Sequence, residues 1–382
     1  MRPLRILHLT TDGSTVAGAE RVLLALGSAA DRARWSLGFA TVGPAGTVNE
    51  LLAATGWPAD SLGYRHATDG PAAVVRLARL VLAHRTDVLH AHLPRAVAFG
   101  ALVAPVLGVP LVQTRHYSDY LHRFGTPAQR RVDRWAAARC AGIAGVSEAA
   151  REHLVQVERI PAVRVVVIEN GVDWAGLSRI DPGPGRATLA ALGVPAGPLV
   201  CCAASLHPRK GLHHLVDAFA PVVARVPAAR LVLLGSGGER DALRERIRGR
   251  GLDDHVRLLG QRVDAHALIA ACDVYVQPSV EEGFGLAVLE AMAMRRPVVV
   301  SDVGGMQITV ENGVSGVRVP PGNPGRLAEA LAGLLLDRAE AARLGGAASA
   351  RVRDHYSVER QVAAYDRWYR SIPRVARRLD RL

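Results

Sequence analysis

The sequence predicts an α/β protein with two parallel sheets, each covered by helices on both faces. Short apolar runs of strand length alternate with longer apolar runs at helical spacing along most of the chain. The chain has 382 residues, and a prior of about 150 residues per domain suggests two domains. Hydrophobic residues make up 49% of the chain, enough for packed cores, and 38 glycines with 22 prolines suit many short loops.

The first half opens with a predicted strand at residues 4–9, a polar loop, and a helix that starts near Gly18 and Ala19. Alternating strand and helix patterns follow at residues 36–42, 47–54, 72–84, 88–90, 95–106 and 111–114. Ligands of parallel sheets gather at the carboxyl ends of the strands. Polar residues follow three of these predicted strands, at residues 10–15, 90–92 and 115–119.

Histidines stand at two of these strand ends. His116 follows the strand at 111–114, and a neutral imidazole there can donate a hydrogen bond to a hydroxyl. The alternative is a histidine that only caps a loop. His90 and His92 have the alternating spacing of a strand, and a structural hydrogen-bonding role and a role in the site both stay open for them. A zinc site would need more ligands than the sequence brings together.

The chain is strongly basic, with a formal net charge of +12 and an isoelectric point of about 10.4. Aromatic residues are only 4% of the chain, and basic and aromatic residues do not interleave, so we expect no nucleic-acid partner. Residues 120–139 are rich in arginine around Trp135. Such a helix either lies on an anionic membrane surface or is an ordinary solvated face, and both interpretations stay open.

The sequence predicts a cytoplasmic protein, either free or peripheral at the inner face of the cell membrane. The apolar run at the start is broken early, so we expect no signal peptide. Residues 96–114 carry no charge, but Pro105, Gly108 and Pro110 divide them into a helix, a turn and a strand. The four cysteines lack metal-ligand spacing, and Cys201 and Cys202 fall in an apolar strand pattern typical of buried thiols.

The division between domains is predicted between residues 175 and 185. Residues 181–185, Asp-Pro-Gly-Pro-Gly, have the composition of the least structured segment in the chain. We therefore expect an N-terminal domain at 1–178 and a C-terminal domain at 179–359.

The only lysine of the chain, Lys210, opens the second half. It follows a predicted strand at 199–204 and precedes a helix at 212–223, with Arg209 beside it. A diphosphate needs cations at such a junction, because helix dipoles offset only part of its charge. Later predicted strands at 231–234 and 256–259 end in small-residue turns, the first of which contains Gly235 and Gly237.

The most informative stretch is residues 277–323. A strand at 273–276 leads into a loop with Gly283, Phe284 and Gly285, and a helix follows at 286–294. A glycine-rich loop that enters a helix offers backbone N–H groups to a phosphate. Glu282 and Glu290 would repel that phosphate, so we expect them to accept hydrogen bonds from hydroxyls. The alternative is a solvated helix with two surface glutamates.

These residues resemble the nucleotide-sugar site of retaining family-4 glycosyltransferases of the GT-B fold. The similarity rests on P-S-x-x-E-G-F-G, E-A-M-A and P-V-V-x-S-D-V-G-G, and on Asn170-Gly171-Val-Asp near the end of the first domain. The resemblance implies two doubly wound Rossmann-like domains facing each other across a cleft, with the donor in the second. It also implies that the C-terminal helix, residues 360–382, packs back on the first domain.

The resemblance assigns roles to individual residues. Glu282 and His116 are the implied catalytic residues, Glu282 through the sugar hydroxyls and His116 through the transferred sugar. Glu290 is the implied ribose ligand. The remaining implied donor-binding residues are Gly18, Ala19, Arg209, Lys210, Gly235, Gly237, Gly283, Phe284, Gly285 and Leu286. Four positions depart from the family pattern: Ala17 replaces the first glycine of a Gly-Gly loop, Ser205 a diphosphate-binding arginine, Arg295 a glycine and Ile308 a glutamate.

The implied function is transfer of a sugar from a nucleoside diphosphate sugar to an acceptor hydroxyl, with retention of the anomeric configuration. The acceptor would be a carbohydrate or a lipid-linked molecule, in cell-envelope polysaccharide or glycolipid synthesis. We expect no cofactor and no metal, because no pair of aspartates lies near the diphosphate residues. The alternatives are a non-catalytic sugar-nucleotide binder and a nucleotide-sugar 2-epimerase.

Overall fold

The computed structural model describes residues 2–376, except residues 15, 17, 117–124 and 374. The chain divides into two compact units. Unit 1 comprises Met1–Gly171 and Val358–Leu382, and unit 2 comprises Val172–Ser357. The division thus falls at 171/172, whereas the sequence suggested 178/179.

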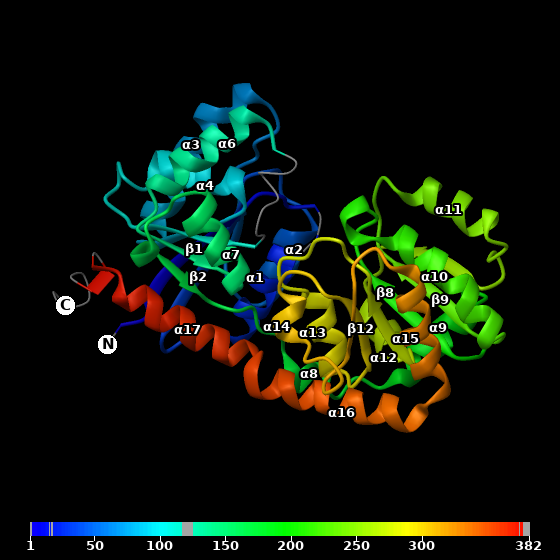
Figure 1. The fold of residues 1–382 in the computed structure, drawn as a ribbon. Helices are drawn as coiled ribbons and strands as arrows, with labels where there is room; N and C mark the ends of the chain where they lie inside the picture. The colour runs from blue at the N-terminus through cyan, green and yellow to red at the C-terminus, as the bar shows by residue number, and fades with distance from the viewer. Residues whose placement is uncertain (1, 15, 17, 117–124, 374, 377–382) are drawn as a thin grey trace. The chain divides into compact units, whose positions relative to one another are not determined.

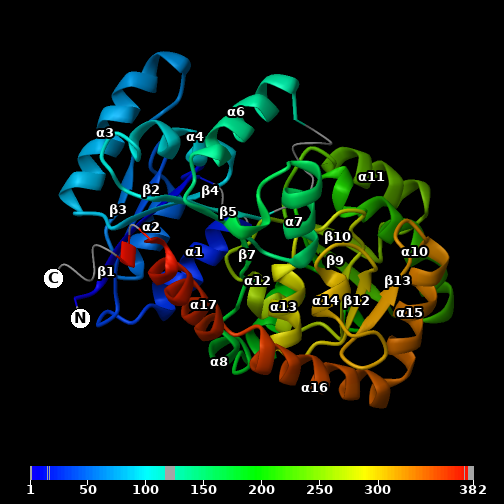
Figure 2. The same ribbon diagram turned by 60° about the vertical axis from the view of Figure 1, so that its left-hand side comes forward.

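Unit 1 is a seven-stranded parallel sheet with helices on both faces (Figures 1 and 2). The strand order is β3-β2-β1-β4-β5-β6-β7. Its strands are β1 (Leu4–Thr10), β2 (Trp35–Thr41), β3 (Ala59–Ser61), β4 (Val88–His92), β5 (Leu111–Arg115), β6 (Gly142–Gly145) and β7 (Val165–Val167). Its helices are α1 (Gly18–Ala29), α2 (Thr47–Ala54), α3 (Gly70–Ala83), α4 (Pro94–Val103), α6 (Pro127–Ala138), α7 (Glu148–Glu152) with a π-helical turn (His153–Val157), and α17 (Val358–Ser371).

Unit 2 is a six-stranded parallel sheet in the order β10-β9-β8-β11-β12-β13. Its strands are β8 (Leu199–Ala203), β9 (Arg230–Leu234), β10 (Val256–Gly260), β11 (Val274–Gln277), β12 (Val298–Ser301) and β13 (Val317–Val319). Its helices are α8 (Trp174–Leu177), α9 (Pro182–Ala191), α10 (Leu212–Arg225), α11 (Arg240–Gly249), α12 (Ala265–Ala270), α13 (Leu286–Ala293), α14 (Met306–Thr309), α15 (Pro324–Leu336) and α16 (Arg338–His355).

Each unit has its own apolar core, as the alternating pattern predicted. In unit 1 the core includes Leu89 and Leu111 of the sheet with Leu77 of α3 and Val97 of α4. In unit 2 the strand residues Val200, Leu231 and Val276 pack with Phe219 of α10 and Leu331 of α15. Each fully buried aliphatic or aromatic side chain stabilises the fold by about 1.5–3 kcal/mol.

The C-terminal helix α17 belongs to unit 1 and lies beside α1 (Figure 2). Tyr365 and Tyr369 are fully buried, and Trp368 is nearly so. Trp35 Nε1 on β2 donates to Asp366 Oδ1 at 2.8 Å. The core of unit 1 is therefore completed by a segment that follows unit 2 in the sequence.

The prediction that residues 181–185 are unstructured is wrong. They form the first turn of α9, because Asp181 is its N-cap and accepts a hydrogen bond from Gly183 N at 2.9 Å. Pro182 fits the first helical position, where its missing N–H costs nothing. Gly185 is needed for packing, because a Cβ there would lie 2.0 Å from the carbonyl oxygen of Ala267 on α12.

Residues 96–114 form helix, loop and strand, as predicted, since α4 ends at Val103 and β5 starts at Leu111. None of the helices in the described part of the chain is long and apolar enough to cross a membrane. Residues 117–124, part of the basic segment around Trp135, lie outside the described residues. Most of the basic C-terminal tail does as well.

Candidate active site

Loops at the carboxyl edge of the unit 2 sheet bring most of the predicted donor residues together. The loop after β8 carries Lys210, and the loop after β11 carries Glu282. Since both strands are parallel and adjacent in the sheet, their following loops meet at one edge. The contact is close: a Cβ added to Gly211, which has φ of 63°, would lie 2.1 Å from the carbonyl oxygen of Pro278.

Lys210 and Glu282 form an ion pair. Lys210 Nζ donates to Glu282 Oε2 at 2.7 Å, and each side chain is only 12% exposed. Ser279 Oγ donates to the same oxygen at 3.2 Å and accepts from Gln277 Nε2 at 2.9 Å. Burial raises the pKa of Glu282, but the charge and hydrogen bond of Lys210 outweigh burial, and the pKa lies below its usual value. The sequence predicted separate partners for these two residues, and the structure pairs them.

Arg209 takes part through its backbone. Its carbonyl oxygen accepts hydrogen bonds from the N–H groups of Val280 at 2.9 Å and Glu281 at 3.2 Å. The Arg209 charge also helps to lower the pKa of Glu282. The β8 and β11 loops are thus held together by main-chain bonds as well as by the Lys210–Glu282 pair.

A glycine loop leads into α13 beside this ion pair. Gly285 precedes the helix with φ of 86°, a conformation that favours glycine. The loop after β12 packs against it, since a Cβ on Gly304 would lie 1.9 Å from the carbonyl oxygen of Glu282. A Cβ on Gly305 would lie 2.6 Å from Cα of Phe284, whose own ring is buried and packs edge-on against Tyr356. The glycine loop thus enters α13 at Leu286 in a conformation that the loop after β12 holds in place.

Glu290 lies one turn into α13 and is 6% exposed. Its Oε2 is 3.3 Å from Nε2 of His266 on α12. Sequence reasoning missed His266, because a single histidine on a short helix gives no signal until the fold places it beside the carboxylate.

Gly235 and Gly237 form a turn that packs on the β8 loop. They have φ of 136° and 156°, and Cβ atoms there would lie 1.9 Å from the Ala204 carbonyl oxygen and 2.3 Å from that of Leu206. Leu206 N also donates to the carbonyl of Ser236 at 2.9 Å. These contacts explain why both positions need glycine, because a side chain would collide with the backbone of the β8 loop. They also place the two glycines next to the loop that carries Lys210.

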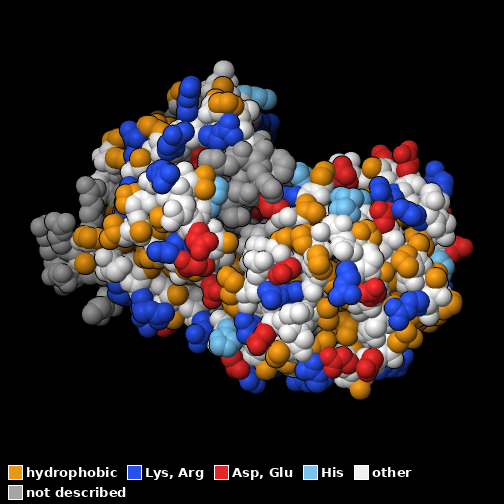
Figure 3. All heavy atoms as spheres, in the orientation of Figure 1, with side chains coloured by type: hydrophobic (Ala, Val, Ile, Leu, Met, Phe, Trp, Pro, Cys, Tyr) orange, Lys and Arg blue, Asp and Glu red, His pale blue; other side chains and the backbone are white. Residues whose placement is uncertain are grey.

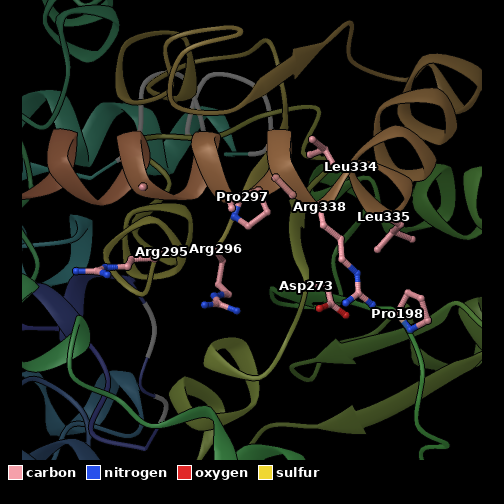
Figure 4. A pocket seen from close by; sticks show the side chains of 11 residues that line it. Pro198, Asp273, Arg295, Arg296, Pro297, Leu334, Leu335 and Arg338 are labelled. Atoms are coloured by element: carbon pink, nitrogen blue, oxygen red, sulfur yellow. The ribbon is translucent and has the colours of Figure 1, made fainter.

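Arg295 lies at the opposite edge of the sheet. It precedes β12, and it lines a cavity with Pro198, Asp273 and Pro297, which precede β8, β11 and β12 (Figure 4). Figure 4 shows the side chain of Arg295 pointing away from Asp273 and Arg338. Because the amino ends of the strands lie here, Arg295 cannot replace the missing diphosphate arginine at Ser205. Arg209 remains the nearer cation.

In unit 1, Gly18 and Ala19 begin α1 after the β1 loop. Ala19 is buried, whereas Gly18 is exposed. Next to them Glu20 is also buried and accepts a hydrogen bond from Thr10 Oγ1 at 2.7 Å. This bond fixes the start of the helix against the end of β1.

His116 follows β5 and is held by other histidines. Its Nε2 lies 2.9 Å from His92 Nδ1, and His92 Nε2 lies 3.0 Å from His8 Nδ1. Burial lowers the pKa of His116 to about 4 and that of His8 to about 3, and it places the pKa of His92 well below the usual range. These rings are therefore neutral at pH 7, the state in which an imidazole both donates and accepts.

The structure supplies the additional histidine that the sequence did not bring to His90 and His92. Among the described residues, His8, His90 and His92 have ligand atoms within 4.8 Å of one another. However, His90 Nδ1 is 2.6 Å from the Tyr369 hydroxyl and its Nε2 is 2.8 Å from Thr114 Oγ1. The cluster is hydrogen bonded in a pattern that leaves no nitrogen of His90 for a metal.

Comparison with known proteins agrees with the motifs. Residues 16–175 match the model of Glycosyltransferase Family 4, and residues 197–337 match that of Glycosyl transferases group 1. Phosphatidyl-myo-inositol mannosyltransferase of Mycobacterium leprae is 32% identical over 268 residues, 69% of this chain and 68% of its own. Alpha-maltose-1-phosphate synthase of Mycolicibacterium smegmatis is 31% identical over 297 residues, 72% of this chain and 76% of its own.

A solved structure is similar over nearly the whole chain. Anabaena Alr3699/HepE in complex with UDP-glucose has a TM-score of 0.84 and 27% identity, over 95% of this chain and 99% of that one. The match supports the expected fold class, two Rossmann-like α/β domains. The chain belongs to the family-4 glycosyltransferases, glycosyl transferases group 1, and has the GT-B fold.

Proposed function

We propose that this glycosyltransferase moves a sugar from a nucleoside diphosphate sugar to a hydroxyl of a carbohydrate or lipid-linked acceptor, with retention. The observation that carries the proposal is the Lys210–Glu282 pair beside the glycine loop and the start of α13. The similar Anabaena structure contains UDP-glucose, and the similar Mycobacterium leprae protein is a mannosyltransferase. We place the reaction in cell-envelope polysaccharide or glycolipid synthesis.

The proposed chemistry begins with an exchange of partners at Lys210. The diphosphate takes the ammonium group, and Glu282 is then available to accept hydrogen bonds from sugar hydroxyls. Backbone N–H groups from Gly283 to Leu286 hold the phosphates, with Arg209 adding positive charge. Glu290 accepts from the ribose diol. His116, as a neutral donor, hydrogen bonds to a hydroxyl of the sugar.

We propose that the reaction needs no metal and that the protein works in the cytoplasm. The Lys210 ammonium and the helix start supply the positive charge that a metal would otherwise give. Cys140, Cys201, Cys202 and Cys272 are buried free thiols, which suits a reducing compartment. Activity that is lost with EDTA and restored by magnesium would contradict the metal proposal.

Thermal shift with UDP, GDP and ADP forms of nucleotides and nucleotide sugars tests the donor site. A ligand that binds only the folded state at about 100 times its Kd adds about 2.7 kcal/mol of stability. We expect one nucleotide series to raise Tm. The test variant is Lys210→Met with Glu282→Gln, because removing the lysine alone leaves a buried carboxylate unpaired.

The double variant should fold and lose the nucleotide effect. Its control is Arg246→Met, which breaks an ion pair with Asp217 on unit 2 outside this edge and should keep the effect. No stabilisation by any nucleotide, or full stabilisation of the double variant, would refute the proposed donor site. Product analysis then separates the alternatives: a glycoside with released nucleoside diphosphate indicates a transferase, an epimerised donor a 2-epimerase, and binding without product a non-catalytic binder.

A further inference from the structure

Four histidines of unit 1 lie close together at three neighbouring parallel strands, and three of them, His8, His92 and His116, form a hydrogen-bonded row. His8 on β1 is in register with His90 on β4, and His92 on β4 is in register with Thr114 on β5. His116 directly follows the end of β5, and its Nε2 lies 2.9 Å from Nδ1 of His92 on the neighbouring β4. His8, His90 and His92 are fully buried. The row therefore runs from the sheet interior at His8 to the carboxyl edge at His116.

Three of these rings are joined end to end. His8 Nδ1 faces His92 Nε2 at 3.0 Å, and His92 Nδ1 faces His116 Nε2 at 2.9 Å. Each neutral ring carries one N–H, so each contact needs one donor and one acceptor. The protonated nitrogen must then be the same on all three rings, either Nδ1 throughout or Nε2 throughout. The tautomer of one ring dictates that of the next.

The surroundings of His8, at the buried end of the row, indicate which ring donates in each of these hydrogen bonds. The Nε2 atom of His8 is buried from solvent and has no hydrogen-bonding partner among the residues that the structure describes. A buried N–H without an acceptor is rare in proteins. We therefore choose the arrangement in which His8 Nε2 carries no proton, because it leaves no buried N–H group without an acceptor. His8 Nδ1–H then donates to His92, His92 Nδ1–H donates to His116 Nε2, and His116 keeps its proton on Nδ1.

We propose that His92, supported by His8, is a positioning residue that holds His116 in one ring orientation with its Nδ1–H directed at a substrate oxygen. The use of that donor for a sugar hydroxyl rests on the proposed function. The tautomer itself does not, because it follows from hydrogen bonds within unit 1.

His90 provides a matched comparison inside the same cluster. Its ring lies against that of His92, with centroids 4.1 Å apart, but its nitrogens pair with the hydroxyls of Tyr369 and Thr114. It is therefore a member of the buried cluster and not of the hydrogen-bonded row. Tyr369→Phe removes a buried hydrogen bond next to the row without changing it.

The first experiment reads the tautomers directly. In the full chain labelled with ¹⁵N histidine, long-range ¹H–¹⁵N correlation spectra at pH 7 distinguish a protonated from an unprotonated ring nitrogen. Single substitutions of the three histidines assign the signals. We expect Nδ1–H tautomers for His8, His92 and His116. Nε2–H tautomers, different tautomers along the row, or averaged signals at His116 would overturn the proposal.

The second experiment separates positioning from structure. His92→Phe should average the His116 signals and lower kcat about tenfold or more with little change in donor KM, since setting the tautomer of a catalytic histidine is worth up to about 10⁴-fold in kcat. His92→Asn can still donate to His116 from its amide, so it should restore the single Nδ1–H tautomer and most of kcat. Tyr369→Phe should leave the His116 tautomer and kcat unchanged, even if the Tm of this variant falls.

Two outcomes would refute the role of His92. The first is a normal single His116 tautomer in His92→Phe. The second is a loss of kcat in Tyr369→Phe equal to that in His92→Phe, which would mean that any damage to the buried cluster has the same effect. Stoichiometric zinc in the purified protein, measured by elemental analysis after EDTA treatment, would show a metal site in place of the hydrogen-bonded row. If the tautomer is as expected but no variant changes turnover, the row exists and the proposed use of His116 fails.

Discussion

At the scale of single residues, the candidate donor site combines opposite charges that are both largely shielded from water. The Lys210–Glu282 pair is short, and Ser279 adds a further hydrogen bond to the same carboxylate oxygen. Removing one member of a buried pair costs more than the pair contributes, because the other charge stays buried. Lys210 therefore has a role in folding as well as its proposed role in binding the donor.

Lys210→Met should destabilise unit 2 by about 3 kcal/mol at pH 7. Glu282 has a lowered pKa in the folded wild type, so its contribution is present above its unfolded pKa and is lost as pH falls through the folded value. In the variant burial still raises the pKa, and only the Arg209 charge and the Ser279 hydrogen bond remain to lower it, so the pKa lies above its wild-type value. The difference between wild type and variant should therefore shrink toward pH 4. Hydrogen exchange of β8 and α13 at several pH values measures it.

Arg246→Met is the control for that variant, because its ion pair with Asp217 is partly exposed and should contribute no more than about 1 kcal/mol. A Lys210→Met effect that is equally small, or that does not change with pH, would contradict the buried-pair account.

Arg295 shows a different effect of a single residue. It occupies a position where the family pattern has glycine, and its backbone has φ of 59°. A non-glycine residue in this conformation loses about 1–2 kcal/mol, of which the added freedom of an unfolded glycine cancels about 0.5–1. Arg295→Gly should thus stabilise unit 2 by roughly 0.5–1 kcal/mol, measured by urea unfolding. Arg295→Ala keeps its Cβ and should give no such gain; equal gains would contradict the backbone explanation.

At the scale of elements, α6 is the clearest surface feature of the basic segment. Asp133, Ala136 and Ala137 face inward, and Asp133 pairs with the buried Arg115 at 2.8 Å. Arg131, Val132, Arg134 and Trp135 are exposed. Figure 3 shows arginine side chains, in blue, gathered over the region of α3 and α6. A basic face with an exposed aromatic residue is suited to an anionic lipid surface.

We expect the protein to bind liposomes that contain anionic lipid, and Arg131→Glu with Arg134→Glu to weaken that binding at least several-fold. Each basic residue near such a surface contributes about 1 kcal/mol. The control is Arg240→Glu with Arg248→Glu on the exposed face of α11, which makes the same change in net charge. Equal losses in both variants would indicate an effect of net charge alone, and no binding to any vesicle would leave α6 as an ordinary solvated face. Co-sedimentation measures the liposome binding of the wild type and of both double variants.

At the scale of the whole molecule, the chain builds unit 1 from two separate segments. Tyr365, Trp368 and Tyr369 of α17 complete its core, and Gln361 Oε1 accepts from Gly171 N at 3.0 Å where the chain leaves the unit. Burial of one such aromatic side chain stabilises the fold by about 1.5–3 kcal/mol. Together they match the net stability of a domain, about 5–15 kcal/mol.

Residues 172–357 alone should therefore fold, with Trp174 as a fluorescence probe, whereas residues 1–171 alone should not. Joining 358–382 to residue 171 through a short linker should restore folding of unit 1. Circular dichroism and limited proteolysis of the three fragments check this. Cooperative unfolding of 1–171 by itself would show that α17 is dispensable.

The sequence alone determined the alternation of strands and helices, the two sheets and the glycine loop that enters α13, because periodicity and turn chemistry are local. It also marked Lys210, since a sole lysine at a strand–helix junction is visible without a structure. It failed at residues 181–185, where the Asp181 cap and the contact of Gly185 with α12 override the composition. Only the tertiary structure decided which distant residues meet: Lys210 with Glu282, His266 with Glu290, and His8 with His92. Those pairs depend on strand order and register, which no local pattern encodes.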